Sequence, residues 1–110
     1  MRAGELDRDI ELQRRVDSVS SSGEPEATWE TISVEYASAS WVQGSERFAA
    51  SQALAEVDVE FRIRWRDGVS PVLRVLFQGT QYDILVVKEI GRREGLSLYA
   101  KARAEALAEG

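Results

Sequence analysis

The stretch of sequence that decides the fold is Val57-Asp58-Val59-Glu60-Phe61-Arg62-Ile63-Arg64-Trp65-Arg66. Apolar and charged residues alternate along it without a break. Because successive side chains of a β-strand point to opposite faces, the apolar residues share one face and the charged residues share the other. The stretch therefore predicts a half-buried β-strand, and the turn dipeptide Asp67-Gly68 ends it.

The sequence after this strand predicts three more strands, at residues 72–77, 81–90 and 96–103. Short turns at 78–80 and 91–95, each containing glycine, separate them. The order strand, turn, strand is typical of antiparallel hairpins.

The segment 81–90 is apolar on more than one face. Tyr82, Ile84 and Val86 alternate along one face, while Leu85 and Val87 make part of the other face apolar. We expect such a strand to be covered on both sides, by a barrel interior and by a helix or a neighbouring subunit.

Two strands are expected before residue 57. The first covers residues 10–16, and residues 17–26, which hold four serines, a glycine and a proline, predict a flexible loop. The second covers residues 29–42, where the apolar phase changes between Tyr36 and Ala37. The change predicts a bulge or a sharp bend, which lets one strand serve two sides of a small barrel.

Residues 43–56 break the alternation. The segment is alanine-rich, Ser45 suits a helix N-cap, and Glu46 would lie in the first turn, where the helix dipole favours a carboxylate. One interpretation is a short helix that closes the barrel end, and the other is a mobile insertion that reaches away from the barrel. Trp41 precedes the segment and is interpreted, like the other two tryptophans, as a core residue, with a second role as an anchor for the insertion.

The predicted fold is therefore mainly all-β: a small antiparallel β-barrel of about six strands, with one short helix or loop inserted between strands 2 and 3. The 110 residues suffice for one domain, which we assign to 1–103, followed by an Ala/Glu-rich tail at 104–110. The longest apolar run, 84–87, is too short to span a bilayer, and the N-terminus lacks the apolar stretch of a signal peptide. We expect a soluble protein made in a cytoplasm.

The chain contains no histidine and no cysteine. Catalytic constellations that need an imidazole or a thiolate are excluded within it, as are their metal sites. Carboxylate pairs such as Glu24/Glu26 are interpreted as solvated side chains. We expect no catalytic residue, no cofactor and no metal.

The net charge of −5 is unevenly distributed, with a balance of −8 over residues 1–60 and +3 over residues 61–110. An acidic chain argues against non-specific nucleic-acid binding, which needs excess positive charge. An acidic and a basic region suit copies that join side by side or stack on unlike partners.

The charged face of the 57–66 strand is the candidate subunit contact. Its members are Asp58, Glu60, Arg62, Arg64 and Arg66. Mixed charges on one strand face favour cross-strand salt links or a subunit contact. Nucleic-acid contact is the alternative, although no aromatic residue is interleaved on that face.

Five stretches, taken in order, match the pattern of a known family. They read Leu6-Asp7-Arg8-Asp9-Ile10-Glu11-Leu12-Gln13-Arg14, Gly23-Glu24-Pro25-Glu26-Ala27-Thr28-Trp29, Gly44-Ser45-Glu46, Phe61-Arg62-Ile63-Arg64-Trp65-Arg66-Asp67-Gly68 and Arg74-Val75-Leu76-Phe77-Gln78-Gly79-Thr80-Gln81-Tyr82-Asp83-Ile84. The chain resembles the phage head–tail joining proteins, also called head-completion or stopper proteins, which gene transfer agents carry too. The resemblance extends from residue 4 to about residue 100.

The resemblance implies a cyclic ring, a hexamer or a dodecamer, in the particle neck. The implied partners are other copies of the chain, an adaptor on the portal side, a tail terminator or tail tube protein on the tail side, and packaged double-stranded DNA in the channel, with no membrane. The family's plug between strands 2 and 3 falls on residues 43–56. The candidate plug residues are Gln43, Gly44, Ser45, Glu46, Arg47, Phe48, Gln52 and Glu56. The acidic half of the chain suits a pore wall that does not grip DNA.

Two other functions stay open at this point. The chain could be a different neck or tail protein, such as an adaptor or a tail terminator, and an adaptor should be mostly helical. It could also be a small β-barrel that binds single-stranded nucleic acid, which would need exposed aromatic residues beside positive charge.

Overall fold

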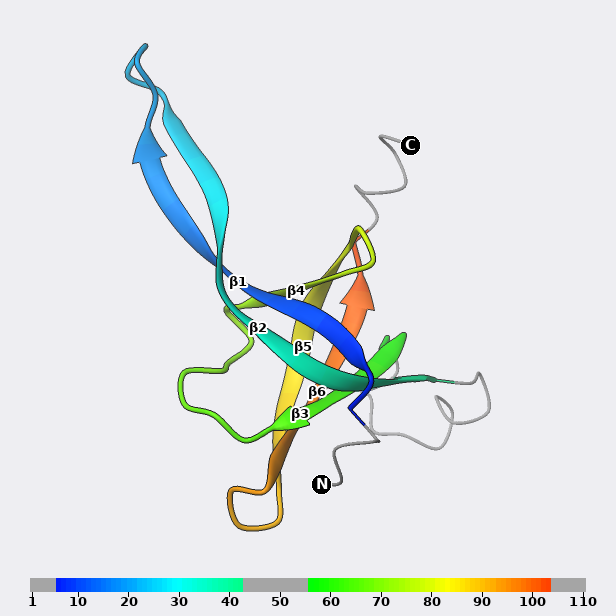
Figure 1. Cartoon of the computed structure of the whole chain (residues 1–110). Coiled ribbons are helices and arrows are strands. Elements are labelled where there is room, and N and C mark those ends of the chain that lie inside the picture. The colour runs from blue at the N-terminus through cyan, green and yellow to red at the C-terminus, as the bar shows by residue number, and fades with distance from the viewer. Residues whose placement is uncertain (1–5, 43–55, 104–110) are drawn as a thin grey trace.

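The computed structural model describes residues 6–42 and 56–103. These residues form six antiparallel strands: β1 (Arg8–Val19), β2 (Pro25–Trp41), β3 (Val59–Arg64), β4 (Arg74–Phe77), β5 (Thr80–Ile90) and β6 (Gly95–Ala102). The strands lie in the order β1-β2-β3-β6-β5-β4, and β4 pairs with β1 to close a barrel (Figure 1). The expected all-β barrel of about six strands is confirmed.

The alternation of the deciding stretch produces the centre of the core. Val59, Phe61 and Ile63 are fully buried inside the barrel, as their shared phase predicts. Phe61 makes edge-to-face contacts with Phe77 and Tyr82, with ring centroids 5.4 Å apart in both pairs. Burying each large apolar side chain contributes about 1.5–3 kcal/mol, so this row is a main source of stability.

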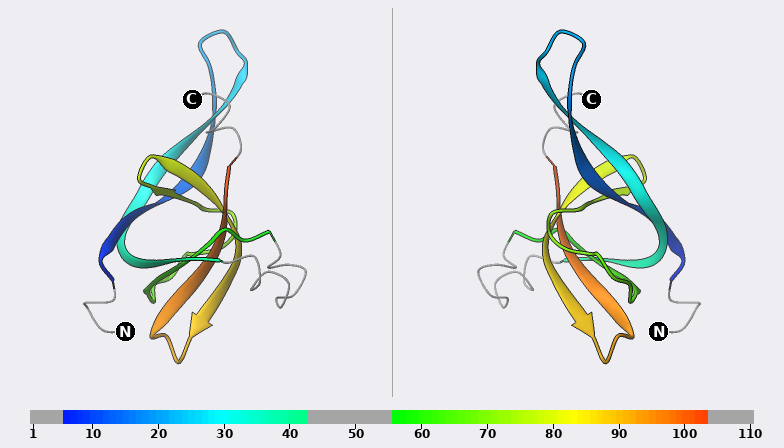
Figure 2. Two further views of the ribbon diagram at one scale, coloured as in Figure 1. Left: turned by 90° about the vertical axis from the view of Figure 1, so that its right-hand side faces the viewer. Right: turned by 90° about the vertical axis from the view of Figure 1, so that its left-hand side faces the viewer.

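The expected loop at 17–26 is shorter in the structure. β1 and β2 take up half of these residues, in register from Val16↔Thr28 to Val19↔Pro25, and only a tight turn over residues 20–24 separates the strands. The turn is closed by hydrogen bonds from Ser20 N to Glu24 O and from Gly23 N to Ser20 O. Residues 14–31 therefore form a two-stranded arm that projects away from the barrel (Figures 1 and 2).

The predicted bulge in the second strand exists, but at another place. Leu12 pairs with Ser33 and Gln13 pairs with Thr31, so Ile32 is the extra residue. This bulge lies where the arm leaves the barrel. A bulge bends its strand and increases the local twist, which accounts for the change of direction between barrel and arm.

No bulge occurs between Tyr36 and Ala37, where the register of β2 with β1 is continuous. Ala37 is fully buried, whereas Val34 and Tyr36 are 64% and 70% exposed. The small side chain is inside because it lies beside the buried β3, where it pairs with Ile63. Val34 and Tyr36 lie on the outer face of the barrel.

A second bulge lies in β5. The β5–β6 register shifts between Ile84 and Val86, so Leu85 is the extra residue. Val87, opposite Leu98, packs against the core in place of the expected Val86. The bulge changes which alternate residues of β5 face the core. This explains why the sequence of 81–90 is apolar on both faces.

No helix in the two described ranges is long and apolar enough to cross a membrane.

Candidate functional site

The insertion between β2 and β3 begins and ends beside one end of the barrel. Residues 43–55 lie outside the described residues, so the helix expected there and the following plug candidates remain predictions: Gln43, Gly44, Ser45, Glu46, Arg47, Phe48 and Gln52. Glu56 is described and exposed, and its carboxylate lies 3.5 Å from Lys101 Nζ on β6.

Asp58 holds the two ends of this insertion together. Its carbonyl accepts a hydrogen bond from Val42 N at 3.0 Å, and its own N–H donates to Ala100 O at 2.9 Å. Its carboxylate Oδ2 accepts a third bond from Ala102 N at 2.9 Å. A predicted subunit-contact residue is therefore engaged within its own chain, where it fixes the exit and the return of the insertion beside β6.

Two aromatic residues lie beside the same exit. The ring centroids of Trp41 and Tyr82 are 6.2 Å apart, and Trp41 is 52% exposed. The assignment of Trp41 to the core is therefore wrong, because it is the last residue of β2 and about half of its surface is exposed. Burial, together with the nearby carboxylate of Asp58, raises the pKa of Tyr82.

The outer side of β3 carries the rest of the predicted contact stripe. Arg62 and Arg64 are exposed. The Glu60 carboxylate accepts hydrogen bonds from Arg62 Nε at 2.9 Å and from Ser97 Oγ at 2.7 Å. Glu60, one of the two acidic members of the stripe, is thus paired with Arg62 within the chain.

The register places further cations beside these arginines. Ser97 on β6 lies between Arg62 on β3 and Lys88 on β5. The Lys88 ammonium is 5.7 Å from the ring centroid of Tyr99, whose pKa is raised by burial and by the charge of Glu60. The outer surface around Tyr99 therefore mixes charges: Arg62, Arg64, Lys88 and Lys101 lie there with Glu60, which is opposite Tyr99, and Asp83, which is opposite Lys101.

Arg66 does not belong to this face. It follows the end of β3, and its guanidinium NH1 donates to a carboxylate oxygen of Glu35 at 3.3 Å. The neighbouring Trp65 is only partly buried, with the guanidinium of Arg93 4.7 Å from its ring centroid. The stripe read from the sequence therefore divides after Arg64, because the strand ends there.

The outer surface of β1 and β2 carries carboxylates beside exposed apolar residues. Asp9 pairs with Tyr36 and Glu11 pairs with Val34, so these four side chains share one face. Ile10 and Leu12, the alternate residues of β1, are buried in the core. The acidic face comprises Asp9, Glu11, Val34 and Tyr36, and sequence reasoning did not identify it.

A polar cluster at the base of the arm was also missed. Arg74 is only 9% exposed, its Nε donates to Gln13 Oε1 at 2.8 Å, and Gln13 Nε2 donates to Thr31 Oγ1 at 3.2 Å. Burial and the nearby charge of Arg103 lower the pKa of Arg74. The sequence offers one signal, because Arg74 is the only charged residue in the predicted strand 72–77. Alternation alone, however, places its side chain in solvent.

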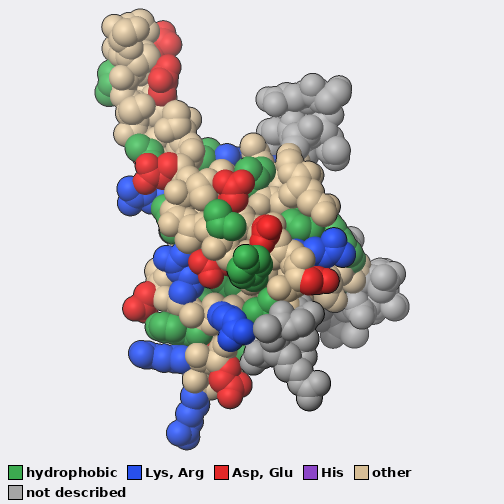
Figure 3. Space-filling model, in the orientation of Figure 1, with side chains coloured by type: hydrophobic (Ala, Val, Ile, Leu, Met, Phe, Trp, Pro, Cys, Tyr) green, Lys and Arg blue, Asp and Glu red, His purple; other side chains and the backbone are tan. Residues whose placement is uncertain are grey.

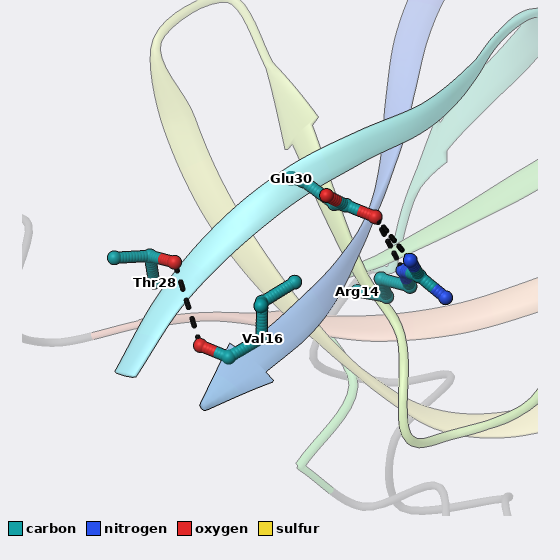
Figure 4. A network of polar contacts seen from close by, with 4 residues as sticks. All are labelled: Arg14, Val16, Thr28 and Glu30. Carbon is teal, nitrogen blue, oxygen red and sulfur yellow. Dashed lines mark hydrogen bonds and ion pairs between the residues drawn. The ribbon is translucent and has the colours of Figure 1, made fainter. Parts of the chain in front are cut away.

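The arm itself has no core. From residue 14 to residue 31 no side chain is buried. Its two strands are joined across the ribbon by an ion pair between Arg14 and Glu30 and by a bond from Thr28 Oγ1 to Val16 O (Figure 4). Two-stranded ribbons are marginally stable in water, so the arm is suited to contact another protein.

Among the described residues, no group of three or more His, Cys, Asp or Glu side chains could hold a metal ion.

Comparisons with known proteins support a shared architecture. The model of a family described as phage head completion protein matches residues 1–103. The solution structure of a protein from Shigella flexneri 2a has a TM-score of 0.79 at 24% identity, over 96% of this chain and 99% of that chain. A chain from the virion of a native gene transfer agent particle has a TM-score of 0.60 at 24% identity, over 89% and 96%. The comparison with curated proteins gives no match.

Proposed function

Since the chain belongs to the family of phage head completion proteins, structural proteins of the head–tail region of the virion, we propose that it is the ring-forming stopper of the particle neck. In this role it closes the DNA channel below the adaptor and offers a surface to the tail. The particle is a tailed phage or a gene transfer agent, and the fold is shared with a chain of a gene transfer agent virion.

The observation that carries this proposal is the anchoring of the insertion. Asp58 joins the last residue before the insertion, Val42, to the end of β6 at Ala100 and Ala102. Both ends of residues 43–56 are therefore held at one rigid position. A plug needs such an anchor, because it must bear the load of a packaged genome while its middle stays free to move.

The acidic part of the chain suits a channel for DNA. Residues 1–60 have a balance of −8, and a wall with this charge repels phosphates and does not retain them. The genome can then pass when the plug opens. A channel lined by the basic half would bind the DNA and slow its exit.

The role is structural and needs no catalysis. The chain lacks histidine and cysteine. Within residues 6–42 and 56–103, the pKa values of Arg74, Tyr82 and Tyr99 are shifted. Each shift follows from burial and neighbouring charges within packed parts of the barrel, which is the setting of structural groups. We therefore assign no catalytic residue and no cofactor.

The arm is the element we assign to the neighbouring neck proteins, the adaptor on one side and the tail terminator or tail tube protein on the other. β2 begins in the arm at Pro25 and ends at Trp41, close to the start of the insertion. The arm and the insertion therefore lie at opposite ends of β2. A subunit built in this way can contact a neck partner with one end while the other end reaches the channel.

The experiment replaces residues 43–56 by a short Gly/Ser linker in the particle-producing host. We expect heads that package DNA but release it before a tail attaches, measured as nuclease-sensitive DNA in purified heads. The matched control replaces the arm's turn, residues 20–24, with a linker of equal length, and its heads should retain DNA. Heads that hold their genome without the insertion would contradict the stopper assignment.

The two alternative functions, another neck or tail protein such as an adaptor and a barrel that binds single-stranded nucleic acid, are less well supported. The described residues form only strands and turns, which disfavours a mostly helical adaptor. The most exposed tyrosine, Tyr36, lies beside carboxylates, and Tyr99, which lies beside cations, is half-buried. Single-stranded nucleic acid needs exposed aromatic rings and positive charge together.

A further inference from the structure

We infer that the arm of one copy docks on the outer side of β2 in the next copy, and that this contact repeats around the ring. The inference rests on the proposed ring and adds which two surfaces meet. The first surface is the apolar face of the arm, formed by Val19, Pro25 and Ala27. The second is the β2 patch, formed by Val34 and Tyr36.

The arm has one apolar face. Residues directly opposite each other in an antiparallel pair share a face, so the pairs Val19↔Pro25 and Asp17↔Ala27 put these four side chains on one side. Val19, Pro25 and Ala27 are all exposed, Val19 by 71%. In Figure 3 the arm stands clear of the barrel, with hydrophobic side chains exposed along it.

The opposite face of the arm is polar. Arg14 and Glu30 form an ion pair there, and Ser18 lies opposite Glu26 (Figure 4 shows the ion pair). Val16, the one apolar residue on this side, is partly buried. This face needs no cover, so it and the turn of the arm stay available to the neck partners.

The β2 patch is the exposed apolar surface on the barrel. Val34 and Tyr36 are alternate residues of β2, so they are neighbours on its outer side, and they are 64% and 70% exposed. Charges of both signs flank them, because Asp9 lies opposite Tyr36 on β1 and the β2–β3 register places Arg64 on the other side of Tyr36. Adjacent exposed apolar residues rimmed by charge are typical of protein–protein contacts.

The arm cannot cover the patch of its own chain. β1 and β2 stay paired along their whole length, with one register shift at the Ile32 bulge. Ala27 and Tyr36 are separated by about 30 Å along the same strand. Folding the arm back would break the strand pairs between them, so the cover for each surface comes from another molecule.

A second copy of the chain supplies both surfaces at once. The arm offers small apolar side chains, which pack well against a tyrosine ring such as that of Tyr36. Asp17 on the same face accepts a hydrogen bond from Arg15 Nε at 2.9 Å, so this face brings no net charge to a patch that charges of both signs flank. The contact is therefore mainly apolar.

The size of the contact favours a closed ring. The strand from Arg14 to Val19 is about 20 Å long and the ribbon about 10 Å wide, so one contact falls below the roughly 1,200 Å² of total buried surface in the smaller stable interfaces. One such contact in a dimer would also leave an arm and a patch uncovered. In a closed ring every copy gives one arm and receives one.

Reciprocal docking of two copies is the competing arrangement. The Ile32 bulge changes the direction of the ribbon between the barrel and the arm (Figure 1). The apolar face of the arm and the β2 patch therefore do not lie in one plane, which disfavours two copies that cover each other at both surfaces. Head-to-tail docking has no such requirement.

The decisive experiment uses a chain that carries no native thiol. Ala27→Cys and Tyr36→Cys put one cysteine on each surface, and purified particles carrying the double variant are treated with a short bifunctional maleimide. We expect a ladder of covalent oligomers that ends at the ring's copy number. The matched control is Thr28→Cys/Tyr36→Cys, whose arm cysteine is on the polar face, and it should give no ladder. Neither should any of the single variants.

The outcomes separate the docking from the proposed function. Particles that contain the variant protein but give no ladder overturn the docking and leave the stopper assignment intact. Products that stop at a dimer identify reciprocal docking, and an equal ladder from the Thr28 control shows contact through the wrong face, so each of these also overturns the docking. Heads that hold their DNA without the protein overturn the proposed function and the docking that rests on it.

A neutral polar substitution tests the same contact without cross-linking. Val19→Gln would bury an amide against the apolar patch of the neighbouring copy, which is unfavourable for a group without a hydrogen-bond partner. We expect at least about tenfold less variant protein per purified particle, measured by quantitative immunoblot. Ser18→Gln, the adjacent residue on the polar face, is the control and should be incorporated normally. Equal incorporation of the two variants would overturn the docking.

Discussion

The guanidinium carbon of Arg74 on β4 lies 4.2 Å from the centroid of the Trp29 ring on β2. Alternation turns Arg74 away from the interior, where Val75 is fully buried, yet Arg74 is itself buried. Trp29, which belongs to the arm, therefore covers a charged residue on the outer side of the barrel. This contact and the bond from Arg74 to Gln13 fix the base of the arm to β4.

Arg74→Met should therefore destabilise the barrel. The change removes a cation–π contact and leaves the buried Gln13 amide oxygen without its donor, and we expect a loss of about 1–3 kcal/mol in the free energy of unfolding. Urea denaturation followed by tryptophan fluorescence measures it. Arg92→Met, on the exposed β5–β6 turn, is the matched control and should cost less than about 0.5 kcal/mol. Equal stability of the two variants would contradict the role of Arg74.

The sequence predicted the barrel because its strands follow a two-residue period. The stretch around Phe61 could be assigned from alternation alone, since one buried face is enough to specify register. The arm could not be predicted, because Ser20, Ser21, Ser22 and Gly23 are typical of loops in general and here form only the turn of a long hairpin.

The outer surface of the barrel shows the same limit of sequence reasoning. Arg62 and Arg64 were identified because they are neighbours in the sequence. Lys88 and Tyr99 join them only through the register of β5, β6 and β3. Tyr36 was counted among apolar strand residues, and nothing local indicates that a bulge at Ile32 would leave it in solvent. Both failures come from pairing between distant strands.

Alkaline pH should destabilise the fold through Tyr82. Burial and Asp58 raise the folded-state pKa of this phenol above its ordinary value of 10.0. The neutral phenol is thus favoured in the fold, so its contribution is fully present below the unfolded-state pKa and is lost as pH rises through the folded-state pKa. The free energy of unfolding, measured in urea at a series of pH values above 9, should fall less steeply in Tyr82→Phe. Tyr99 is shifted in the same direction, so part of the slope should persist in that variant, and a slope unchanged from that of the unaltered chain would count against the assignment.

Asp58→Ala should loosen the return of the insertion. The Ala102 N–H would lose its carboxylate acceptor, and a lost hydrogen bond of this kind costs about 1–3 kcal/mol. Amide hydrogen exchange should be faster at Ala102 and unchanged at Leu98, in the middle of β6. Asp58→Asn keeps an oxygen acceptor and should recover part of the protection. Unchanged exchange at Ala102 in the alanine variant would show that the carboxylate does not hold β6.

Tyr36→Thr should separate assembly from folding. The ring is 70% exposed, so its removal should change the free energy of unfolding by less than about 0.5 kcal/mol. Phe61→Ala, in the core, should cost about 3–5 kcal/mol. Assembly of the Tyr36 variant, measured by sedimentation velocity, should weaken although its unfolding curve is unchanged. A Tyr36 variant that unfolds early would mean that the outer face contributes to the barrel itself.

Shortening the arm should leave the barrel folded. Arg15 pairs with Trp29 across the ribbon, so replacing residues 16–28 by Asn-Gly forms a two-residue hairpin turn with the register preserved. No residue between 14 and 31 is buried, and Trp29 is retained over Arg74, so the change in the free energy of unfolding should stay within about 1 kcal/mol. Far-UV circular dichroism and urea denaturation measure this. Because the arm is assigned to contact between neck proteins, particles carrying the short arm should fail to join heads to tails even though the purified subunit is stable. A subunit that no longer folds would instead make the arm part of the folding unit, and normal particle yield would remove it from the contact with the neck partners.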